Sequence, residues 1–257
     1  VLVSFVLPAV LTWLFAIPLR KWGWIKEGDL KLDLYMPGNE KPKLFIYMHG
    51  GGLTSGSRDA GIRFDTLMSD GIAAASLDYR MYPDAKFPDF IEDCARAVAF
   101  LKTELEGKIS GIYVGGSSAG AYLSMMLLFD KHYLGAYGID PFDINGWVLD
   151  AGQPTVHFNV LAERGLDPRL VRIDEAAPLW FVDEKLVPEN RKVPDVLIIS
   201  SEHDMECRLE QLRLLEATMK HFGWPEDRLR FRYMEGYSHC SYIGEPVFAE
   251  LIESIVK

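Results

Sequence analysis

The sequence predicts an α/β fold in which a mostly parallel central sheet is covered by helices on both faces. Along the 257 residues, short apolar runs rich in β-branched side chains alternate with longer segments of helical periodicity. Several of these runs are apolar at consecutive positions, as parallel strands buried on both faces require. A chain of this length buries a substantial core in one domain, so we expect residues 1–257 to form a single domain.

Seven segments have the composition of buried strands and are expected to form the sheet. They cover residues 32–35, 44–48, 72–77, 109–115, 147–149, 196–200 and 229–234. Four segments have the pattern of helices. They cover residues 90–105, 119–129, 209–222 and 246–257. Residues 152–193 fit the alternation poorly, so we expect them to form part of a small cap over the carboxyl edge of the sheet, where open α/β sheets bind ligands.

The segment 1–19 is almost entirely apolar and is close to the length that spans a bilayer. Pro8 and Pro18 interrupt it, and no cationic stretch precedes it in this sequence. We therefore expect residues 1–24 to supply the rest of the cap. Two alternatives remain open. The segment is either an anchor that contacts a membrane or the remainder of a trimmed signal peptide.

The net charge and the cysteine content indicate which binding partners and which compartment to expect. A net charge of -10 argues against a nucleic-acid partner, because binding one depends on clustered Lys and Arg side chains. Cys94, Cys207 and Cys240 lack the spacing of a metal site, so no metal is expected. This small, odd number fits a reducing compartment, which favours a cytoplasmic protein with buried thiols.

A motif of the form G-x-S-x-G lies between a predicted strand and a predicted helix. It is made by Gly116, Ser118 and Gly120. In this context the motif is typical of a strained turn that exposes a serine nucleophile at the start of a helix. Ser117 is the rival nucleophile, but only Ser118 has glycines two positions away on both sides.

The run His49-Gly50-Gly51-Gly52 follows the predicted strand 44–48. Glycines here leave backbone amides free to stabilise an oxyanion, together with the amide that follows the nucleophile. We predict the donors to be Gly51, Gly52 and Ala119, with His49 organising the loop. The alternative, a phosphate-binding loop, lacks its lysine motif.

An acid and a histidine are expected after the two last strands, in that order. Asp204 follows the strand 196–200 and is the predicted acid, with Glu202 and Glu206 as alternatives. His239 follows the final strand and is the only histidine in that part of the chain. Ser118, Asp204 and His239 are thus the predicted catalytic residues, and we expect His203 to be structural.

With Asp78-Tyr79-Arg80 and the following Pro83, Pro88 and Asp93, these motifs resemble the hormone-sensitive-lipase-like esterases of the α/β-hydrolase superfamily. The resemblance runs from about residue 32 to the end of the chain. It implies the α/β-hydrolase fold and hydrolysis of short acyl esters without a metal or organic cofactor. Ser117 departs from the family, which usually has another residue before the nucleophile. Plant-wall acetyl and feruloyl esterases have a similar build.

Several large apolar residues are candidates for a substrate pocket. They are Leu53, Trp147, Phe158, Trp180 and Phe181. Core packing is the alternative for each of them. Carboxylesterase activity on a small-molecule ester is the leading hypothesis. The alternatives are a carbohydrate acetyl or feruloyl esterase, a lipase, and a non-catalytic binding module on the same fold.

Overall fold

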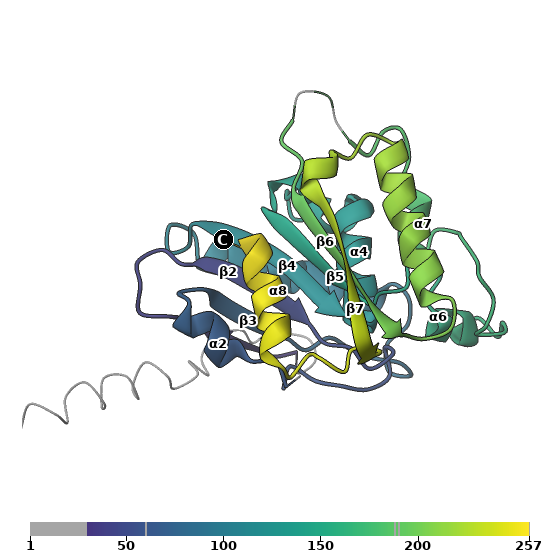
Figure 1. Ribbon diagram of the computed structural model, residues 1–257, viewed down its shortest axis with the longest axis horizontal. Coiled ribbons are helices and arrows are strands. Elements are labelled where there is room, and N and C mark those ends of the chain that lie inside the picture. The colour runs from purple at the N-terminus through teal and green to yellow at the C-terminus, as the bar shows by residue number, and fades with distance from the viewer. Residues whose placement is uncertain (1–29, 60, 188, 190, 257) are drawn as a thin grey trace, which may run out of the picture.

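A seven-stranded sheet runs through the centre of the molecule (Figure 1). The computed structural model describes residues 30–59, 61–187, 189 and 191–256. The strands are β1 (Leu32–Tyr35), β2 (Lys43–Met48), β3 (Ala73–Leu77), β4 (Gly111–Ser117), β5 (Gly146–Asp150), β6 (Asp195–His203) and β7 (Leu229–Ser238). Their order is β1-β3-β2-β4-β5-β6-β7, and β1 pairs antiparallel with β3 whereas all other pairs are parallel. The predicted mostly parallel sheet is therefore confirmed.

Helices cover both faces of this sheet. The helices are α2 (Phe64–Ser69), α3 (Asp89–Glu104), α4 (Ala119–Phe129), α5 (His132–Gly135), α6 (Phe158–Glu163), α7 (Arg208–His221) and α8 (Pro246–Val256). Buried residues of α3, α4 and α7 share one apolar cluster with one face of the strands. Buried residues of α2 and α8 form a second cluster on the opposite face. In Figure 1, α2 and α8 accordingly lie apart from α4 and α7.

The predicted strands and helices lie close to the observed ones, and the differences have local causes. Strand β6 continues to His203, three residues beyond its predicted end, because Ser201 and His203 still pair with β7. Its last two residues, Glu202 and His203, are exposed and polar, so composition alone does not indicate a strand there. Helices α2, α5 and α6 were not predicted, since their six, four and six residues are too few to display a clear apolar stripe.

The segment between β5 and β6 contains the predicted cap residues 152–193, including α6 and the 3₁₀ turn Pro178–Phe181. It is tied to α4, the helix that follows Ser118, because the Tyr122 hydroxyl in α4 donates to the Ala176 carbonyl at 2.9 Å. The predicted contribution of residues 1–24 lies outside the described residues. Among the helices that the structure does describe, none has the length and apolar character needed to cross a bilayer.

Candidate active site

Ser118 lies in a strained turn between β4 and α4. Its φ of 55° and ψ of -115° are unusual for a residue with a side chain, so the surrounding structure must hold it. Gly120 permits the close approach of β2, since a Cβ there would lie 1.9 Å from the Met48 carbonyl oxygen. The Ser118 amide donates to the Asp150 carbonyl at 2.8 Å, which ties the turn to the end of β5.

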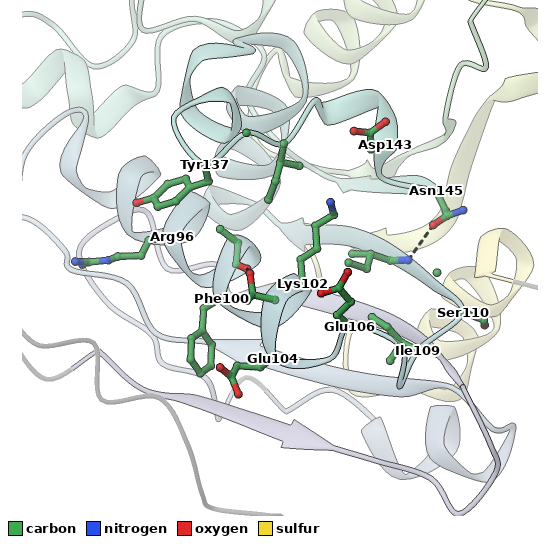
Figure 2. A pocket seen from close by; sticks show the side chains of 17 residues that line it. Arg96, Phe100, Lys102, Glu104, Glu106, Ile109, Ser110, Tyr137, Asp143 and Asn145 are labelled. Carbon is green, nitrogen blue, oxygen red and sulfur yellow. Dashed lines mark hydrogen bonds between the residues drawn. The ribbon is translucent and has the colours of Figure 1, made fainter.

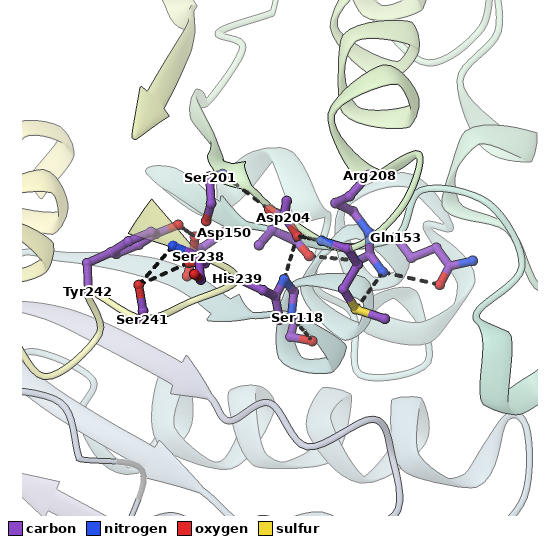
Figure 3. A network of polar contacts seen from close by, with 12 residues as sticks. Ser118, Asp150, Gln153, Ser201, Asp204, Arg208, Ser238, His239, Ser241 and Tyr242 are labelled. Atoms are coloured by element: carbon purple, nitrogen blue, oxygen red, sulfur yellow. Dashed lines mark hydrogen bonds and ion pairs between the residues drawn. The ribbon is translucent and has the colours of Figure 1, made fainter. Parts of the chain in front are cut away.

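Ser118, His239 and Asp204 form a continuous hydrogen-bonded series (Figure 3). His239 Nδ1 lies 2.5 Å from Asp204 Oδ1, and His239 Nε2 lies 2.9 Å from Ser118 Oγ. Because the carboxylate can only accept, Nδ1 carries the proton and Nε2 accepts from the Ser118 hydroxyl. This tautomer leaves Nε2 able to take the hydroxyl proton.

Asp204 is held as a carboxylate by several donors. The amides of Met205 and Ser201 donate to it at 2.7 and 3.2 Å. Burial alone would raise the pKa of Asp204, but the hydrogen bonds from His239 and these amides outweigh it and lower the pKa below its usual value.

The alternative candidates for the acid, the histidine and the serine do not join this hydrogen-bonded series. Glu202 accepts instead from the Gly236 amide at 2.7 Å, and Glu206 is exposed. His203 contributes its carbonyl, which accepts from the His239 amide at 3.2 Å. The Ser117 side chain is fully buried in the structure, so a substrate cannot reach it.

The glycine loop after β2 lies directly against Ser118. A Cβ at Gly50 would come within 3.3 Å of the Ser118 Cβ. Gly51 has a φ of +105°, and a Cβ there would lie 2.0 Å from the Ser55 carbonyl oxygen, so only glycine fits this turn. Within the described residues, the backbone amides of Gly51, Gly52 and Ala119 donate no hydrogen bond. The predicted oxyanion donors are therefore free to bind a ligand oxygen.

The side chains of His49 and Tyr79 support this loop through hydrogen bonds and ring stacking. His49 Nδ1 lies 2.7 Å from the Gly50 carbonyl, and the His49 ring stacks on Tyr79 at 4.3 Å. The Tyr79 hydroxyl donates to the His49 carbonyl at 2.8 Å. Burial lowers the pKa of His49, so the ring is neutral and donates from Nδ1. His49 thus lies where an organising residue is expected.

The predicted cap segment, residues 152–193, contacts the same loop through a residue that sequence reasoning missed. Asn159 in α6 donates from Nδ2 to the Gly52 carbonyl. The neighbouring Phe158 ring also packs there, since a Cβ at Gly52 would lie 3.4 Å from its Cζ. Of the predicted pocket residues, Phe158 is therefore at the edge of the site.

Two other pocket predictions are corrected by burial. Leu53 is 1% exposed and Trp147 is fully buried, and both belong to the main apolar core. Trp147 is the second residue of β5, so it lies near the strand end remote from Ser118. Trp180 is 57% exposed on the cap, and Phe181 packs at the edge of the core. Sequence cannot separate such cases, because each apolar side chain suits both a core and a pocket.

Asp150 is a fully buried carboxyl group beside the triad. Its Oδ1 accepts from the Tyr242 hydroxyl at 2.5 Å. Burial raises the pKa of Asp150 to about 6, although hydrogen bonds from Ser117 and Tyr242 offset part of this effect. Because Tyr242 follows His239 by three residues, the pair joins the histidine loop to the strand that also receives the Ser118 amide.

We expect the Asp150→Asn variant to gain stability relative to the wild type as the pH rises. Between pH values of about 4 and about 6, the folded wild type binds a proton that the unfolded chain releases, so its stability falls with rising pH. The raised pKa corresponds to a loss of about 3 kcal/mol in the wild type's free energy of unfolding over this window. The asparagine variant cannot titrate at this position and does not undergo this loss. Urea unfolding on both sides of the window measures the difference. The exposed Asp84→Asn variant is the control, and a difference between wild type and Asp150→Asn that is independent of pH would contradict the expectation.

A recess of about 740 Å³ lies at the amino end of β4, at the other end of this strand from Ser118 (Figure 2). It is lined by the end of α3 and by Gly111, the first residue of β4, whereas Ser118 follows the last residue of that strand. None of the triad residues borders it. The recess is therefore separate from the candidate active site.

The described residues contain no cluster of three His, Cys, Asp or Glu side chains arranged to hold a metal ion. The three cysteines are free thiols. Cys94 is buried and Cys240 half-buried, but Cys207 is exposed, so the prediction of a buried thiol is wrong there. Cys207 stands just before the first residue of α7.

Comparison with known proteins gives one family and several similar structures. The BD-FAE family matches residues 32–136, a stretch that includes Ser118 but neither Asp204 nor His239. The apo form of Thermogutta terrifontis esterase 2 is 20% identical, with a TM-score of 0.71, over 90% of this chain and 90% of that one. A bacterial heroin esterase is 18% identical, with a TM-score of 0.67, over 98% of this chain and 89% of that one.

A third similar structure is a bifunctional GH43-CE protein of Bacteroides eggerthii. It is 19% identical with a TM-score of 0.68, and the match covers 88% of this chain but 33% of that one. The Thermogutta esterase has also been solved with butyrate and with propionate bound. These likenesses establish a shared fold.

Proposed function

We propose that this chain, which has the α/β-hydrolase fold, is a carboxylic-ester hydrolase that uses Ser118 as its nucleophile. The hydrogen-bonded series from Asp204 through His239 to Ser118 carries the proposal. It lies at the carboxyl ends of the parallel strands, where open α/β sheets place their chemistry. Free backbone amides beside the serine complete the requirements for acyl transfer.

The reaction begins with proton transfer from the Ser118 hydroxyl to His239 Nε2 as the oxygen attacks the ester carbonyl. Asp204 holds the imidazole in the required tautomer and stabilises the imidazolium. His239 then protonates the departing alcohol, which leaves an acyl group on Ser118. Water, activated by the same histidine, releases the acid and restores the serine.

The tetrahedral intermediate places a negative charge on the former carbonyl oxygen. The amides of Gly51, Gly52 and Ala119 donate to this oxygen, and each donor contributes about 3 kcal/mol to transition-state stabilisation. Gly51 and Gly52 belong to the braced loop, and Ala119 is the first residue of α4, whose amino end attracts negative charge. The loop therefore enters the reaction already oriented.

Short acyl chains are the proposed substrates. The Phe158 ring lies beside Gly52 of the oxyanion loop, since a Cβ at Gly52 would come 3.4 Å from its Cζ, and we infer that it limits the length of the acyl chain. The butyrate and propionate complexes of the Thermogutta esterase, a protein of the same fold, agree with a short acyl group.

Hydrolysis of p-nitrophenyl esters from acetate to palmitate tests the proposal. We expect turnover to be greatest with acetate and butyrate and to fall steeply with longer chains. An optimum at long chains would replace the short-chain assignment with that of a lipase. Absence of turnover with every ester would contradict the proposed function itself.

Esters of carbohydrates are the second candidate. The observation that favours them is the bifunctional GH43-CE protein of Bacteroides eggerthii, in which the matching part, 33% of that chain, shares this fold. Acetylated xylan and methyl ferulate therefore belong in the same substrate panel. A kcat/KM for either that exceeds the value for p-nitrophenyl butyrate would favour this second candidate.

The Asn159→Ala variant is expected to lower kcat by about tenfold with little change in KM, because the oxyanion loop loses one of its supports. Steady-state kinetics with p-nitrophenyl butyrate measure this effect. Asn39→Ala is the matched control, since Asn39 contacts Gly71 near the amino ends of β2 and β3, far from Ser118. An equal kcat for the two variants would show that the Asn159 contact does not support the loop during turnover.

A further inference from the structure

Arg208 is a buried cation next to the triad that the proposed reaction does not use. It is the first residue of α7, four positions after Asp204, and is 3% exposed. Among the described residues, no carboxylate lies within ion-pair distance of its guanidinium. The Asp204 carboxylate attracts the guanidinium from beyond that distance, and hydrogen bonds must offset the rest of the free-energy cost of burying the charge.

The guanidinium donates to the segment that follows β5. Arg208 Nη1 lies 2.7 Å from the Ala151 carbonyl, and Nη2 lies 3.5 Å from Gln153 Oε1. Ala151 has a positive φ of 52°, so the chain turns sharply at this point. The preceding residue, Asp150, receives the Ser118 amide through its carbonyl. Arg208 thus joins the loop that carries the acid to the strand end that holds the nucleophile.

Gln153 extends this connection into the cap. Its Nε2 donates to the Val156 carbonyl at 2.9 Å, and its Oε1 accepts from the Phe158 amide at 3.3 Å. Phe158 begins α6, and the next residue, Asn159, donates to the Gly52 carbonyl of the oxyanion loop. A series of polar contacts therefore runs from the acid loop through Arg208 and Gln153 to the oxyanion loop.

Figure 3 shows how this series lies in space. Arg208 and Gln153 stand on one side of the Asp204–His239 pair, and Asp150 with Tyr242 stands on the other. Helix α7 and the cap are linked a second time one turn further along, where the Thr155 hydroxyl donates to Gln211 at 3.0 Å. The guanidinium is thus held in one orientation behind the acid.

We propose that Arg208 is a positioning residue, whose paired hydrogen bonds to Ala151 and Gln153 fix the Asp204 loop relative to the nucleophile and the oxyanion loop. This inference rests on the proposed function. A planar guanidinium reaches two acceptors at once, whereas a lysine ammonium at the same place cannot match that fork. A displacement of about 1 Å in such a site is enough to lower turnover by about 10²-fold.

The Arg208→Lys and Gln153→Met variants test the proposal, with Arg213→Lys as the control in the same helix. Arg213 is half-exposed and pairs with Glu216. We expect the first two variants to lower kcat by about 10- to 100-fold with KM nearly unchanged, and the control to keep the wild-type kcat. Titration of Ser118 with a fluorophosphonate gives the concentration of active enzyme, so loss of folded protein does not enter kcat.

A second readout needs no substrate. Because His239 Nδ1 lies 2.5 Å from Asp204 Oδ1, we expect the proton between them to give a strongly downfield-shifted NMR resonance. We expect Arg208→Lys to shift or broaden this resonance and Arg213→Lys to leave it in place. An unchanged resonance, together with an unchanged kcat per titrated serine, would overturn the proposal even if the variant melts at a lower temperature. If Arg208→Lys does not fold, Gln153→Met decides on the same criteria. If the wild type hydrolyses no ester, the proposed function fails, and the resonance alone decides whether Arg208 positions the acid.

Discussion

Replacing Ser118 with alanine is expected to lower kcat for p-nitrophenyl butyrate by about 10⁴- to 10⁶-fold, because the variant cannot form an acyl-enzyme. The free amides of Gly51, Gly52 and Ala119 remain, so a small residual rate over water is expected. The same variant should no longer gain mass when it is treated with a fluorophosphonate, a reagent that labels the activated serine.

Ser117→Ala is the matched control for this experiment. Ser117 is adjacent in sequence but is fully buried at the end of β4. Its removal is expected to change kcat by no more than about threefold. If Ser117→Ala abolished turnover and labelling while Ser118→Ala retained them, the nucleophile assignment would be wrong.

The Asp204→Asn variant is expected to lower kcat by about 10⁴-fold. Asparagine has nearly the same shape, but its neutral amide can donate to His239 Nδ1 and so favours the tautomer that cannot accept the Ser118 proton. It also removes the negative charge that stabilises the imidazolium. Because the Met205 and Ser201 amides still find an acceptor oxygen in the side chain, we expect the fold to be retained.

Glu202→Gln separates this effect from a general loss of acidic charge near the histidine. Glu202 receives the Gly236 amide, and glutamine keeps an oxygen that can do the same. We expect this variant to keep kcat within about threefold of the wild type. Steady-state kinetics of both variants at one pH decide between the two acids, and a greater loss in Glu202→Gln would reverse their order.

The acid illustrates how far sequence reasoning reaches. Its position after the strand 196–200 left Glu202, Asp204 and Glu206 as candidates. The continuation of β6 to His203 exposes Glu202 at the strand end and leaves Asp204 as the first residue of the loop. The hydrogen bond to His239, 35 positions away in the chain, then separates Asp204 from Glu206.

Several contacts around the site gave no sequence signal at all. Arg208, Gln153 and Asn159 are ordinary polar residues in segments without a motif, and each contacts a partner far along the chain. Asp150 did give a weak signal, since it ends an apolar strand at the edge where the site forms. A carboxyl group there is either exposed or buried, and only the packing of Tyr242 decides that it is buried.

The sequence by itself indicated the seven strands, the four longer helices, the tight turn at Ser118 and the glycine loop. These features depend on local physics, because apolar periodicity and the backbone freedom of glycine act over a few consecutive residues. The tertiary structure decided which apolar residues are core and which border the site, as Leu53, Trp147 and Phe158 show. It also decided which polar side chains support the triad, because burial and hydrogen bonding depend on segments that meet only when the sheet has formed.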